Sequence, residues 1–329
     1  MRYKSELDLL ETEKAIKFVK DEFEKQLAKA LNLTRVSAPL FVAPETGLND
    51  NLNGVERAVK FDVLTLKKDV EIVQSLAKWK RNALAKYGFK AGSGLYTDMN
   101  AIRRDETLDA LHSVYVDQWD WEKVITRRQR NKEYLRGTVR SIYRVFKYTA
   151  EKTKEKFPKL KGLYLPDDVT FITTAELEAK YPDLDGHGRE NEFAKEFKAI
   201  FVEEIGWPLK SGKPHDGRAS DYDDWNLNGD LLIWDEVLGI ALEISSMGIR
   251  VDDKSLKAQM EFKGEKARMT SPYHKAVLNE ALPLSIGGGI GQSRLCMLIL
   301  EKAHIGEVQA SIWSEDDLAL LRKNNIILL

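Results

Sequence analysis

Residues 94–122 read GLYTDMNAIRRDETLDALHSVYVDQWDWE, in which two apolar stretches flank the polar segment RRDETLDA at residues 103–110. Valine, tyrosine and tryptophan are frequent in the second stretch and favour extended backbone. Two strands joined by a polar loop predict an antiparallel pair. The remaining elements of the chain can be placed around this pair.

The second of these strands has two chemically different faces. Side chains of a strand point alternately to opposite sides, so residues two apart share a face. One face carries Val114, Val116, Gln118, Asp120 and Glu122, and the other carries Tyr115, Asp117, Trp119 and Trp121. The aromatic face suits a core. Gln118 and Asp120 would cost free energy if buried unpaired, so a polar ligand is a natural partner for them.

Three segments show the apolar spacing of amphipathic helices. The first has its apolar stripe at Ile16, Val19, Phe23, Leu27 and Leu31 and should end near Asn32. The second, LAKWKRNALAKYG at residues 76–88, closes on Gly88. The third lies between residues 126 and 162 and has its stripe at Leu135, Val139, Ile142 and Phe146. Its arginines are interpreted as a solvated face.

Further strands and one more helix complete the prediction. The segment TRVSAPLFV, residues 34–42, is extended, and its Pro39 suits an edge strand. Alternation at residues 59–65 predicts another strand, and DLLIW and IALEISS form a hairpin around DEVLG at residues 235–239. Ser271 and Pro272 mark the start of a helix, with Gly287 after its end. We therefore expect an α+β fold, a largely antiparallel sheet flanked by helices, in a single domain spanning 1–329.

Composition excludes several functional classes. The 51 lysines and arginines are balanced by 52 aspartates and glutamates, so the strong positive field typical of nucleic-acid binding is missing. The one cysteine, Cys296, lies among apolar residues and is interpreted as a core side chain, which agrees with a reducing compartment. The sequence has no signal peptide and no apolar run of about 18 residues. A cytoplasmic protein without a membrane or nucleic-acid partner is expected.

The stretch SIGGGIGQSRLCMLIL, residues 285–300, places four glycines before Arg294 and an apolar helix. Its spacing fits neither the dinucleotide-binding pattern nor the P-loop pattern. The glycines could serve only for close strand packing. A guanidinium fixed after a bare strand can also bind a phosphate bidentately while the glycines let a flat ring approach. Arg103, His112 and the Gln118 and Asp120 face form a second candidate cluster on adjacent strands.

Several motifs together resemble a known family. Arg103 with its acidic loop resembles motif 2 of the class II aminoacyl-tRNA synthetases, GGGIGQSR resembles their motif 3, and the first helix with TRVSAP resembles motif 1. Within that superfamily the chain is similar to the ammonia-dependent asparagine synthetases, the aspartate–ammonia ligases. The matching runs are DNLNG, SLAKWKR, GLYTDM, LHSVYVDQWDWE, DYDDW, LNGD, SSMGIRV and GGGIGQSR. They extend over nearly the whole chain.

The resemblance implies a homodimer that uses ATP and Mg²⁺ to activate L-aspartate as β-aspartyl-AMP, which ammonia then converts to asparagine. Arg103 would hold the α-phosphate and Arg294 the far end of the triphosphate, as expected where charge neutralisation drives catalysis. The other nucleotide-binding residues implied are His112, Asp223, Asp230, Glu243, Ser245 and Gly289. Asp230 and Glu243 would also bind the metal, and alternation places Glu243 and Ser245 on one face.

The same resemblance assigns the amino-acid pocket. Its substrate-binding residues are Ser75, Lys80, Gln118, Asp120, Ser246 and Arg250. Lys80 and Arg250 meet the substrate carboxylates, whereas Gln118, Asp120 and Asp50 meet its ammonium group. We also expect Asp50 to bind or deprotonate ammonia. Cys296 lies far from the N-terminus, so no N-terminal cysteine is present to release ammonia from glutamine.

Three positions depart from the family pattern. Asp105 stands where motif 2 usually has glutamate, which leaves its contact with adenine open. Only Asn226 separates DYDDW from LNGD, so we expect either that Asp223 and Trp225 contact the nucleotide differently than in relatives with a longer loop, or that the active site is more open. Arg104 follows Arg103 where proline is usual, and the sequence does not decide which arginine faces the phosphate.

A second functional class is a synthetase-like protein that binds tRNA or a regulatory partner without making asparagine. The basic segment at 126–162 allows a tRNA contact, but the near-neutral charge argues against it. An aspartyl-tRNA synthetase would carry an additional anticodon-binding module, and the catalytic pattern leaves no room for one here. A non-catalytic relative would be expected to lose Arg103, Glu243 or Arg294, and all three are present.

Overall fold

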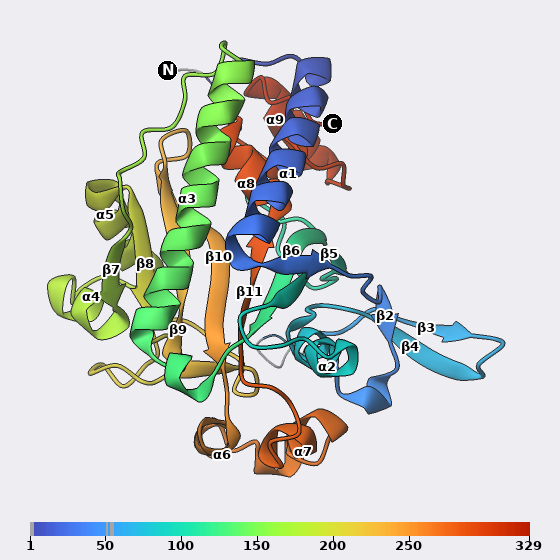
Figure 1. Ribbon diagram of the computed structural model, residues 1–329. Coiled ribbons are helices and arrows are strands. Elements are labelled where there is room, and N and C mark those ends of the chain that lie inside the picture. The colour runs from blue at the N-terminus through green and yellow to red at the C-terminus, as the bar shows by residue number, and fades with distance from the viewer. Residues whose placement is uncertain (1–2, 51, 53–55) are drawn as a thin grey trace.

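The structure is a computed structural model that describes residues 3–50, 52 and 56–329, and it is built around an eight-stranded sheet (Figure 1). In spatial order the strands are β1 (Leu33–Arg35), β5 (Gly94–Ile102), β6 (Tyr115–Val124), β11 (Ser285–Gly291), β10 (Ile240–Arg250), β9 (Asp223–Asp235), β8 (Ala199–Glu203) and β7 (Thr170–Thr173). The five central pairings are antiparallel, whereas β1 pairs with β5 and β7 with β8 in parallel. The expected fold class is confirmed.

Helices α1 (Leu9–Leu31), α3 (Lys132–Lys156) and α8 (Gln292–Ile299) cover one face of this sheet (Figure 1). The apolar stripes predicted for α1 and α3 are buried in the core. Phe23 of α1 stacks on Trp119 of β6, with the ring centroids 4.8 Å apart. Trp119, Trp121 and Cys296 are fully buried. The aromatic face of β6 therefore points into the core, which leaves its polar face on the opposite side of the sheet.

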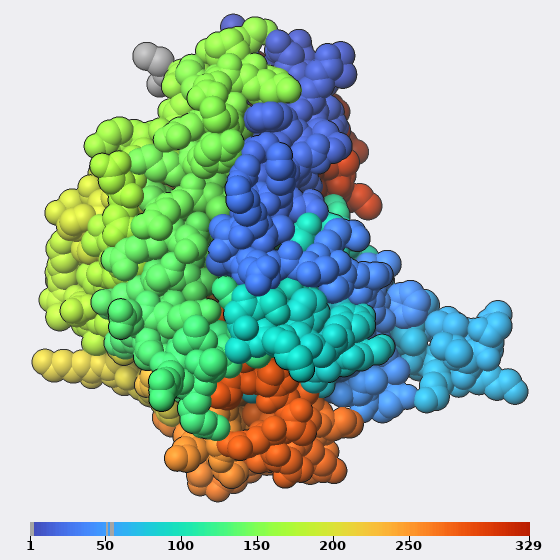
Figure 2. Space-filling view, in the orientation of Figure 1, coloured from blue at the N-terminus to red at the C-terminus, as the bar shows by residue number. Residues whose placement is uncertain are grey.

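That opposite side is bordered by α2 (Ala77–Tyr87), α6 (Asp253–Phe262) and α7 (Pro272–Leu278). α2 ends at Gly88 as predicted. Gly88 adopts the left-handed backbone conformation, and its N–H donates a hydrogen bond to the carbonyl of Ala85. A small sheet of β2 (Phe41–Val42), β4 (Lys68–Ile72) and β3 (Lys60–Val63) projects from the body of the protein (Figure 1). The space-filling view shows the same projection, with α1 and α3 packed side by side (Figure 2).

Two parts of the sequence prediction differ from the structure. The helix that starts at Ser271 and Pro272 ends at Leu278, and Gly287 does not follow its end but lies inside β11. Gly287 pairs there with Gly248 of β10 and Glu122 of β6. The strand predicted at residues 59–65 is shorter, because the chain leaves β3 after Val63 and turns through residues 64–67.

The sequence prediction did not include the elements between residues 163 and 222 or at the C-terminus. They are β7, β8, α4 (Thr174–Lys180), α5 (Gly186–Phe197) and α9 (Glu315–Lys323). Short 3₁₀ turns occur at Pro44–Thr46, Arg127–Gln129, Lys266–Arg268 and Ile305–Glu307. α5 packs on β8, β9 and β10 at the end of the sheet remote from β1. This placement brings the loop before β9 to the edge of the polar face.

Candidate active site

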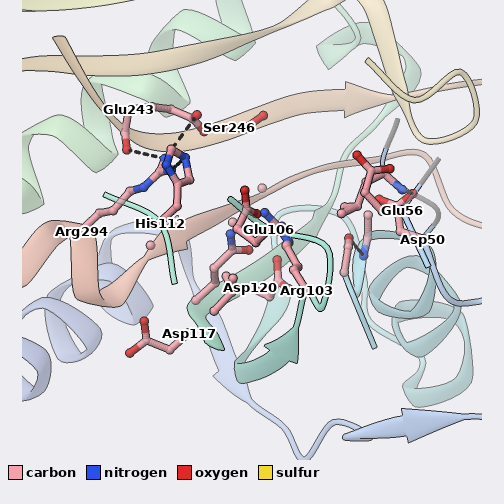
Figure 3. Close-up of a pocket in the computed structure, with 18 of the residues that line it drawn as sticks. Asp50, Glu56, Arg103, Glu106, His112, Asp117, Asp120, Glu243, Ser246 and Arg294 are labelled. Atoms are coloured by element: carbon pink, nitrogen blue, oxygen red, sulfur yellow. Dashed lines mark hydrogen bonds and ion pairs between the residues drawn. The ribbon is translucent and has the colours of Figure 1, made fainter. Parts of the chain in front are cut away.

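A cavity of about 490 Å³ lies on the polar face of the central strands. β6 contributes Gln118 and Asp120, β10 contributes Glu243 and Ser246, and β11 contributes Gly288 and Gly289. The predicted site residues that line it are Asp50, Ser75, Lys80, Arg103, His112, Gln118, Asp120, Asp223, Glu243, Ser246, Arg250, Gly289 and Arg294. Residues from four strands and from helices α2 and α8 thus converge on one cavity, part of which Figure 3 shows.

Arg250 forms the charged floor of the cavity. Its Nε and Nη2 donate to the carboxylate of Glu122 at 2.7–3.1 Å, and its Nη1 donates to Asp223. All three side chains are buried. Burial opposes ionisation of Glu122, but the guanidinium outweighs it and holds the pKa of that carboxyl below its ordinary value. Arg250, for which a substrate-binding role is predicted, thus already has its guanidinium paired with two carboxylates.

Lys80 lies beside this floor. Its ammonium group donates to Asp120 of β6 and to the carbonyl of Gly288, 2.9 Å away. Burial lowers the pKa of Lys80. The residues of KWKR alone favoured an exposed helix position for this lysine, and only the family resemblance indicated a site residue. The structure places its charge next to the acceptors of the polar face.

Asp50 is a buried residue in the lining of the cavity. It is 3% exposed, and its Oδ1 accepts from the backbone amide of Leu52 at 3.1 Å. Within the described part of the chain its Oδ2 has no hydrogen-bond partner. Burial raises the pKa of this carboxyl to about 6. Three other residues of the matching DNLNG run, Asn51, Asn53 and Gly54, lie outside the described residues.

A buried polar cluster near Asp50 was not predicted. Lys78 of α2 donates to Asp221 at 3.1 Å, and His274 of α7 lies 2.9 Å from the same carboxylate oxygen. Burial opposes the charge of Asp221, yet Lys78 and His274 hold the pKa of its carboxyl well below the usual range. This cluster ties α2 and α7 to the start of β9. Its only sequence signal was the acidic run DYDDW, from which no single carboxylate could be chosen.

The two arginines of the motif 2 loop differ in their position relative to the cavity. Arg103 lines the cavity, and its Nε is buried without a partner among the described residues. Arg104 is exposed and does not line the cavity. The next residue, Asp105, forms an ion pair with Arg57 and accepts from its backbone amide at 2.9 Å. The side-chain hydrogen bond from Arg57 lowers the pKa of Asp105 to about 2. Asp105 also lines the cavity.

At the other end of the cavity, Arg294 is held by three groups. One Nη2 hydrogen points to His112 Nε2 at 2.8 Å, while Nη1 lies 3.5 Å from Glu243 Oε2 and donates to the Glu243 carbonyl at 3.4 Å (Figure 3). Since arginine only donates, His112 accepts on Nε2 and carries its proton on Nδ1. That Nδ1 donates to Asp109 at 2.8 Å. Arg294 and Arg103 thus supply cations to opposite parts of one hollow.

Asp230 and Ser245 are the two predicted residues that do not line the cavity. A register shift in β10 between Glu243 and Ser245 breaks the alternation, so the expectation that these two share a face is wrong. Ser246 lines the cavity with Glu243 instead, and the Ser245 hydroxyl donates to the Gly289 carbonyl at 2.9 Å.

Asp230 of β9 lies behind Arg218, which pairs with it and lines the cavity in its place. Burial raises the pKa of Asp230 to about 7, and Glu243 adds to this effect while Arg218 opposes it. Arg218 was not predicted as a site residue, because it belongs to a loop without periodicity.

The glycines of β11 make room for side chains of the chain itself. A β-carbon at Gly287 would collide with the Glu122 carboxylate, and one at Gly289 would collide with the Gln118 amide oxygen. Both collisions are with the polar side chains of β6. The bare strand therefore allows Gln118 and Glu122 to lie flat across β11, a role that the predicted approach of a flat ring did not include.

Carboxylates of the cavity could accept a divalent cation from the phosphates. Within the described ranges no group of three or more histidine, cysteine or acidic side chains is arranged to hold a metal by itself. Mg²⁺ commonly takes one or two carboxylates and completes its shell with phosphates and water. Glu243, which lines the cavity, and Asp230, which lies behind Arg218 on the neighbouring strand, are two such carboxylates. In the parts of the chain that the structure describes, no helix is long and apolar enough to cross a membrane.

Comparison with solved structures identifies the fold class. Asparaginyl-tRNA synthetase from Pyrococcus horikoshii in complex with asparaginyl-adenylate superposes with a TM-score of 0.67, at 18% identity, over 92% of this chain and 70% of that chain. The enzyme of the same name from Entamoeba histolytica, also bound to asparaginyl-adenylate, gives 0.66 at 15% identity over 93% and 68%. The fold is that of the class II aminoacyl-tRNA synthetase catalytic core.

Sequence comparison narrows this class to one family. The aspartate–ammonia ligase family model matches residues 10–325. The aspartate–ammonia ligase of Fusobacterium nucleatum is 59% identical over 329 residues, which is 100% of both chains. That of Ruminiclostridium cellulolyticum is 60% identical over 328 residues, covering 99% of this chain and 97% of the relative. The chain belongs to the aspartate–ammonia ligase family.

Proposed function

We propose that this ATP-dependent ligase joins ammonia to the side-chain carboxyl of L-aspartate through β-aspartyl-AMP. Family membership over the full chain establishes the overall reaction, the synthesis of asparagine from aspartate and ammonia with ATP. The intermediate and the roles of individual residues are our inference. The observation that supports them best is one cavity lined by Arg103, Arg294, Lys80 and Asp120, in which the two arginines lie apart from each other (Figure 3).

In the first step a β-carboxylate oxygen of aspartate attacks the α-phosphorus of ATP, and the bond to pyrophosphate breaks. Arg103 has a buried Nε without a partner among the described residues and is suited to the charge that develops on the α-phosphate. Arg294 would leave Glu243 and His112 to bind the far phosphates. His112, Asp223, Ser245 and Gly289 complete the proposed nucleotide site. Here Ser245 acts through the Gly289 carbonyl, because its hydroxyl is already bonded to it.

Mg²⁺ would be held by Glu243 and Asp230 together with phosphate oxygens. Two acidic side chains on adjacent strands, whose mutual repulsion helps to raise the pKa of Asp230, fit a divalent cation. When bound, the metal would neutralise charge on the leaving pyrophosphate. The protein would position the metal, because Asp230 is held by β9 and Glu243 by the adjacent strand β10.

The amino acid would lie over the polar end of β6. Lys80 and Arg250 provide positive charge for its carboxylates, and Asp120 and Gln118 provide acceptors for its ammonium group. Ser75 and Ser246 line the same hollow and can donate hydrogen bonds to the substrate. The Arg250 guanidinium is already bonded to Glu122 and Asp223. Its proposed contribution to substrate binding is therefore mainly a positive charge held in a fixed position on the floor of the cavity.

In the second step the ammonia nitrogen attacks the β-carbonyl carbon, and AMP leaves with the former carboxylate oxygen. Asp50 is suited to bind ammonium and accept its proton, since one of its oxygens is buried without a partner in the described part of the chain and its pKa is raised to about 6. Supplied β-aspartyl-AMP would react with ammonia about a hundredfold or more slowly in Asp50→Asn. An unchanged rate would contradict this role.

Three broader proposals accompany the mechanism. We propose a single catalytic domain over 1–329, a homodimer, and a cytoplasmic location. The buried free thiol of Cys296 supports a reducing compartment. Sedimentation velocity would test the dimer, because a monomer of 37.5 kDa is readily separated from a dimer.

The direct test of the first step is aspartate-dependent exchange of labelled pyrophosphate into ATP without ammonia. Exchange with aspartate but not with glutamate would support adenylation of the shorter side chain. No exchange under conditions in which ammonia still drives asparagine formation would contradict a discrete adenylate. The binding-only alternative is not favoured, because Arg103, Glu243 and Arg294 all line the cavity.

A further inference from the structure

The loop before β9 holds an arginine that no role described above uses. Arg218 follows the loop residues 206–217 and reaches the acidic edge of the cavity. Its Nη2 donates to Asp230 Oδ1, and its side chain is only 13% exposed. Asp230 does not line the cavity, whereas Arg218 does. Arg218 therefore covers the carboxylate that we propose to bind magnesium.

The loop is fixed on both sides of Arg218. His215 is buried and lies 2.9 Å from Glu190 of α5, and the carbonyl of Ala219 accepts from the indole of Trp225 at 3.0 Å. Between these anchors, Asp216 and Gly217 are exposed. Such anchoring keeps the backbone in place, so the long arginine side chain is the part that can change partners.

Arg218 also differs from the structural arginine of the same site. Arg250 uses Nε, Nη1 and Nη2 in bonds to two buried carboxylates and is 2% exposed. Arg218 bonds to one oxygen of Asp230, and its Nε is buried with no partner in the described part of the chain. An arginine has five donors, and burying them unpaired is costly. Arg218 therefore has donors available for an anionic ligand.

Each of the two proposed magnesium ligands is paired with an arginine. Arg218 covers the buried Asp230, whereas Arg294 lies 3.5 Å from a Glu243 carboxylate that stays 41% exposed. Magnesium–ATP brings both a cation for the carboxylates and anionic oxygens for the guanidinium groups. Each arginine can therefore exchange a carboxylate for a phosphate without leaving a buried charge unpaired.

We propose that Arg218 is a further catalytic residue, which covers Asp230 in the free protein and binds the phosphate tail when magnesium–ATP displaces it. This inference rests on the magnesium site proposed above. It predicts opposite effects on two ligands when Arg218 is removed. If the ion pair were purely structural, removing Arg218 would weaken the binding of both ligands or of neither.

The test is the binding of Mn²⁺, used in place of Mg²⁺ and followed by electron paramagnetic resonance, together with ATP binding by calorimetry. In Arg218→Ala, Mn²⁺ without nucleotide should bind at least about tenfold more tightly, because Asp230 is uncovered. ATP should bind about tenfold to a hundredfold more weakly, because a charged hydrogen-bond donor is lost. Asp230→Asn placed in the same variant should abolish the gain in Mn²⁺ affinity.

Two further variants keep the test decisive. Arg218→Lys retains a cation over Asp230, so Mn²⁺ affinity without nucleotide should not change, but ATP should bind about tenfold more weakly without the guanidinium fork. This variant decides the question if Arg218→Ala does not fold. Arg136→Ala is the matched control, because Arg136 of α3 pairs with another buried carboxylate, Glu203, on the other side of the sheet. This variant should change neither the Mn²⁺ affinity nor the ATP affinity.

Unchanged ATP affinity in Arg218→Lys, or unchanged Mn²⁺ affinity in a folded Arg218→Ala protein, would overturn the proposal. If the unaltered protein bound no Mn²⁺ in its ATP complex, the magnesium site would fail together with this inference. If it bound Mn²⁺ with ATP while the Arg218 variants behaved like Arg136→Ala, only the inference would fail.

Discussion

Replacing Asp50 with asparagine should stabilise the protein at neutral pH even though it slows the reaction. Burial raises the pKa of Asp50 from 3.8 to about 6, so the native state resists ionisation that the unfolded chain allows. A shift of about two pKa units corresponds to roughly 3 kcal/mol. Asparagine avoids that cost but places an amide donor near the unpartnered position of Oδ2, which forfeits about 1 kcal/mol.

The sign of the effect depends on pH. Below about pH 4 the carboxyl is protonated in both states and carries no ionisation cost. Between pH 4 and 6 the unfolded state loses its proton first, so the wild type loses stability relative to Asp50→Asn. Above about pH 6 the difference is constant, with the variant more stable by about 2 kcal/mol.

Thermal denaturation of both proteins from pH 4 to pH 8 measures this difference. At about 2 cal/mol/K of unfolding entropy per residue, 2 kcal/mol corresponds to a rise in Tm of about 3 °C for a chain of this size. Other carboxylates titrate equally in both proteins and cancel. A Tm difference that does not depend on pH, or a less stable variant at pH 7, would refute the argument that burial disfavours the ionised form of Asp50.

Three further predictions follow from the site. Arg103→Ala should lower aspartate-dependent ATP–pyrophosphate exchange by a factor of about 10² to 10³, because it removes a preorganised cation, whereas Arg104→Ala should leave the exchange rate nearly unchanged. Glu122→Ala should lower the free energy of unfolding in urea by about 3–5 kcal/mol, because the buried Arg250 loses its bidentate partner. Chelation of divalent cations by EDTA should abolish exchange, and added Mg²⁺ should restore it.

Each of these outcomes can fail on its own. Equal losses in the Arg103 and Arg104 variants would contradict the assignment of the phosphate-binding arginine. A change of less than about 1 kcal/mol in Glu122→Ala would mean that its ion pair behaves like an exposed one. Exchange that persists in EDTA would contradict the use of a metal.

Local periodicity predicted most of the central sheet. The alternation in β6 placed Trp119 and Trp121 in the core and Gln118 and Asp120 in the cavity, because a half-buried strand needs one apolar and one polar side. Helix α1 was predicted for the same reason, and its end at Asn32 is confirmed. These elements depend mainly on neighbours in sequence.

Features that depend on distant parts of the chain were not predictable. The register shift in β10 after Glu243 arises from pairing with β9, so it changes which serine faces the cavity without any local signal. The ion pair of Arg218 with Asp230 requires a loop without periodicity to fold back onto β9. Lys80 was predicted as a site residue only through family resemblance, since its burial depends on Asp120 and Gly288.

The central claim, that one site first adenylates the aspartate side chain and then transfers it to ammonia, is tested most directly with aspartate labelled with ¹⁸O in its β-carboxyl group. Attack of that carboxylate on the α-phosphorus predicts one labelled oxygen in the phosphate of AMP and the other in the amide of asparagine. Labelled oxygen in pyrophosphate or inorganic phosphate, with none in AMP, would contradict the β-aspartyl-AMP mechanism.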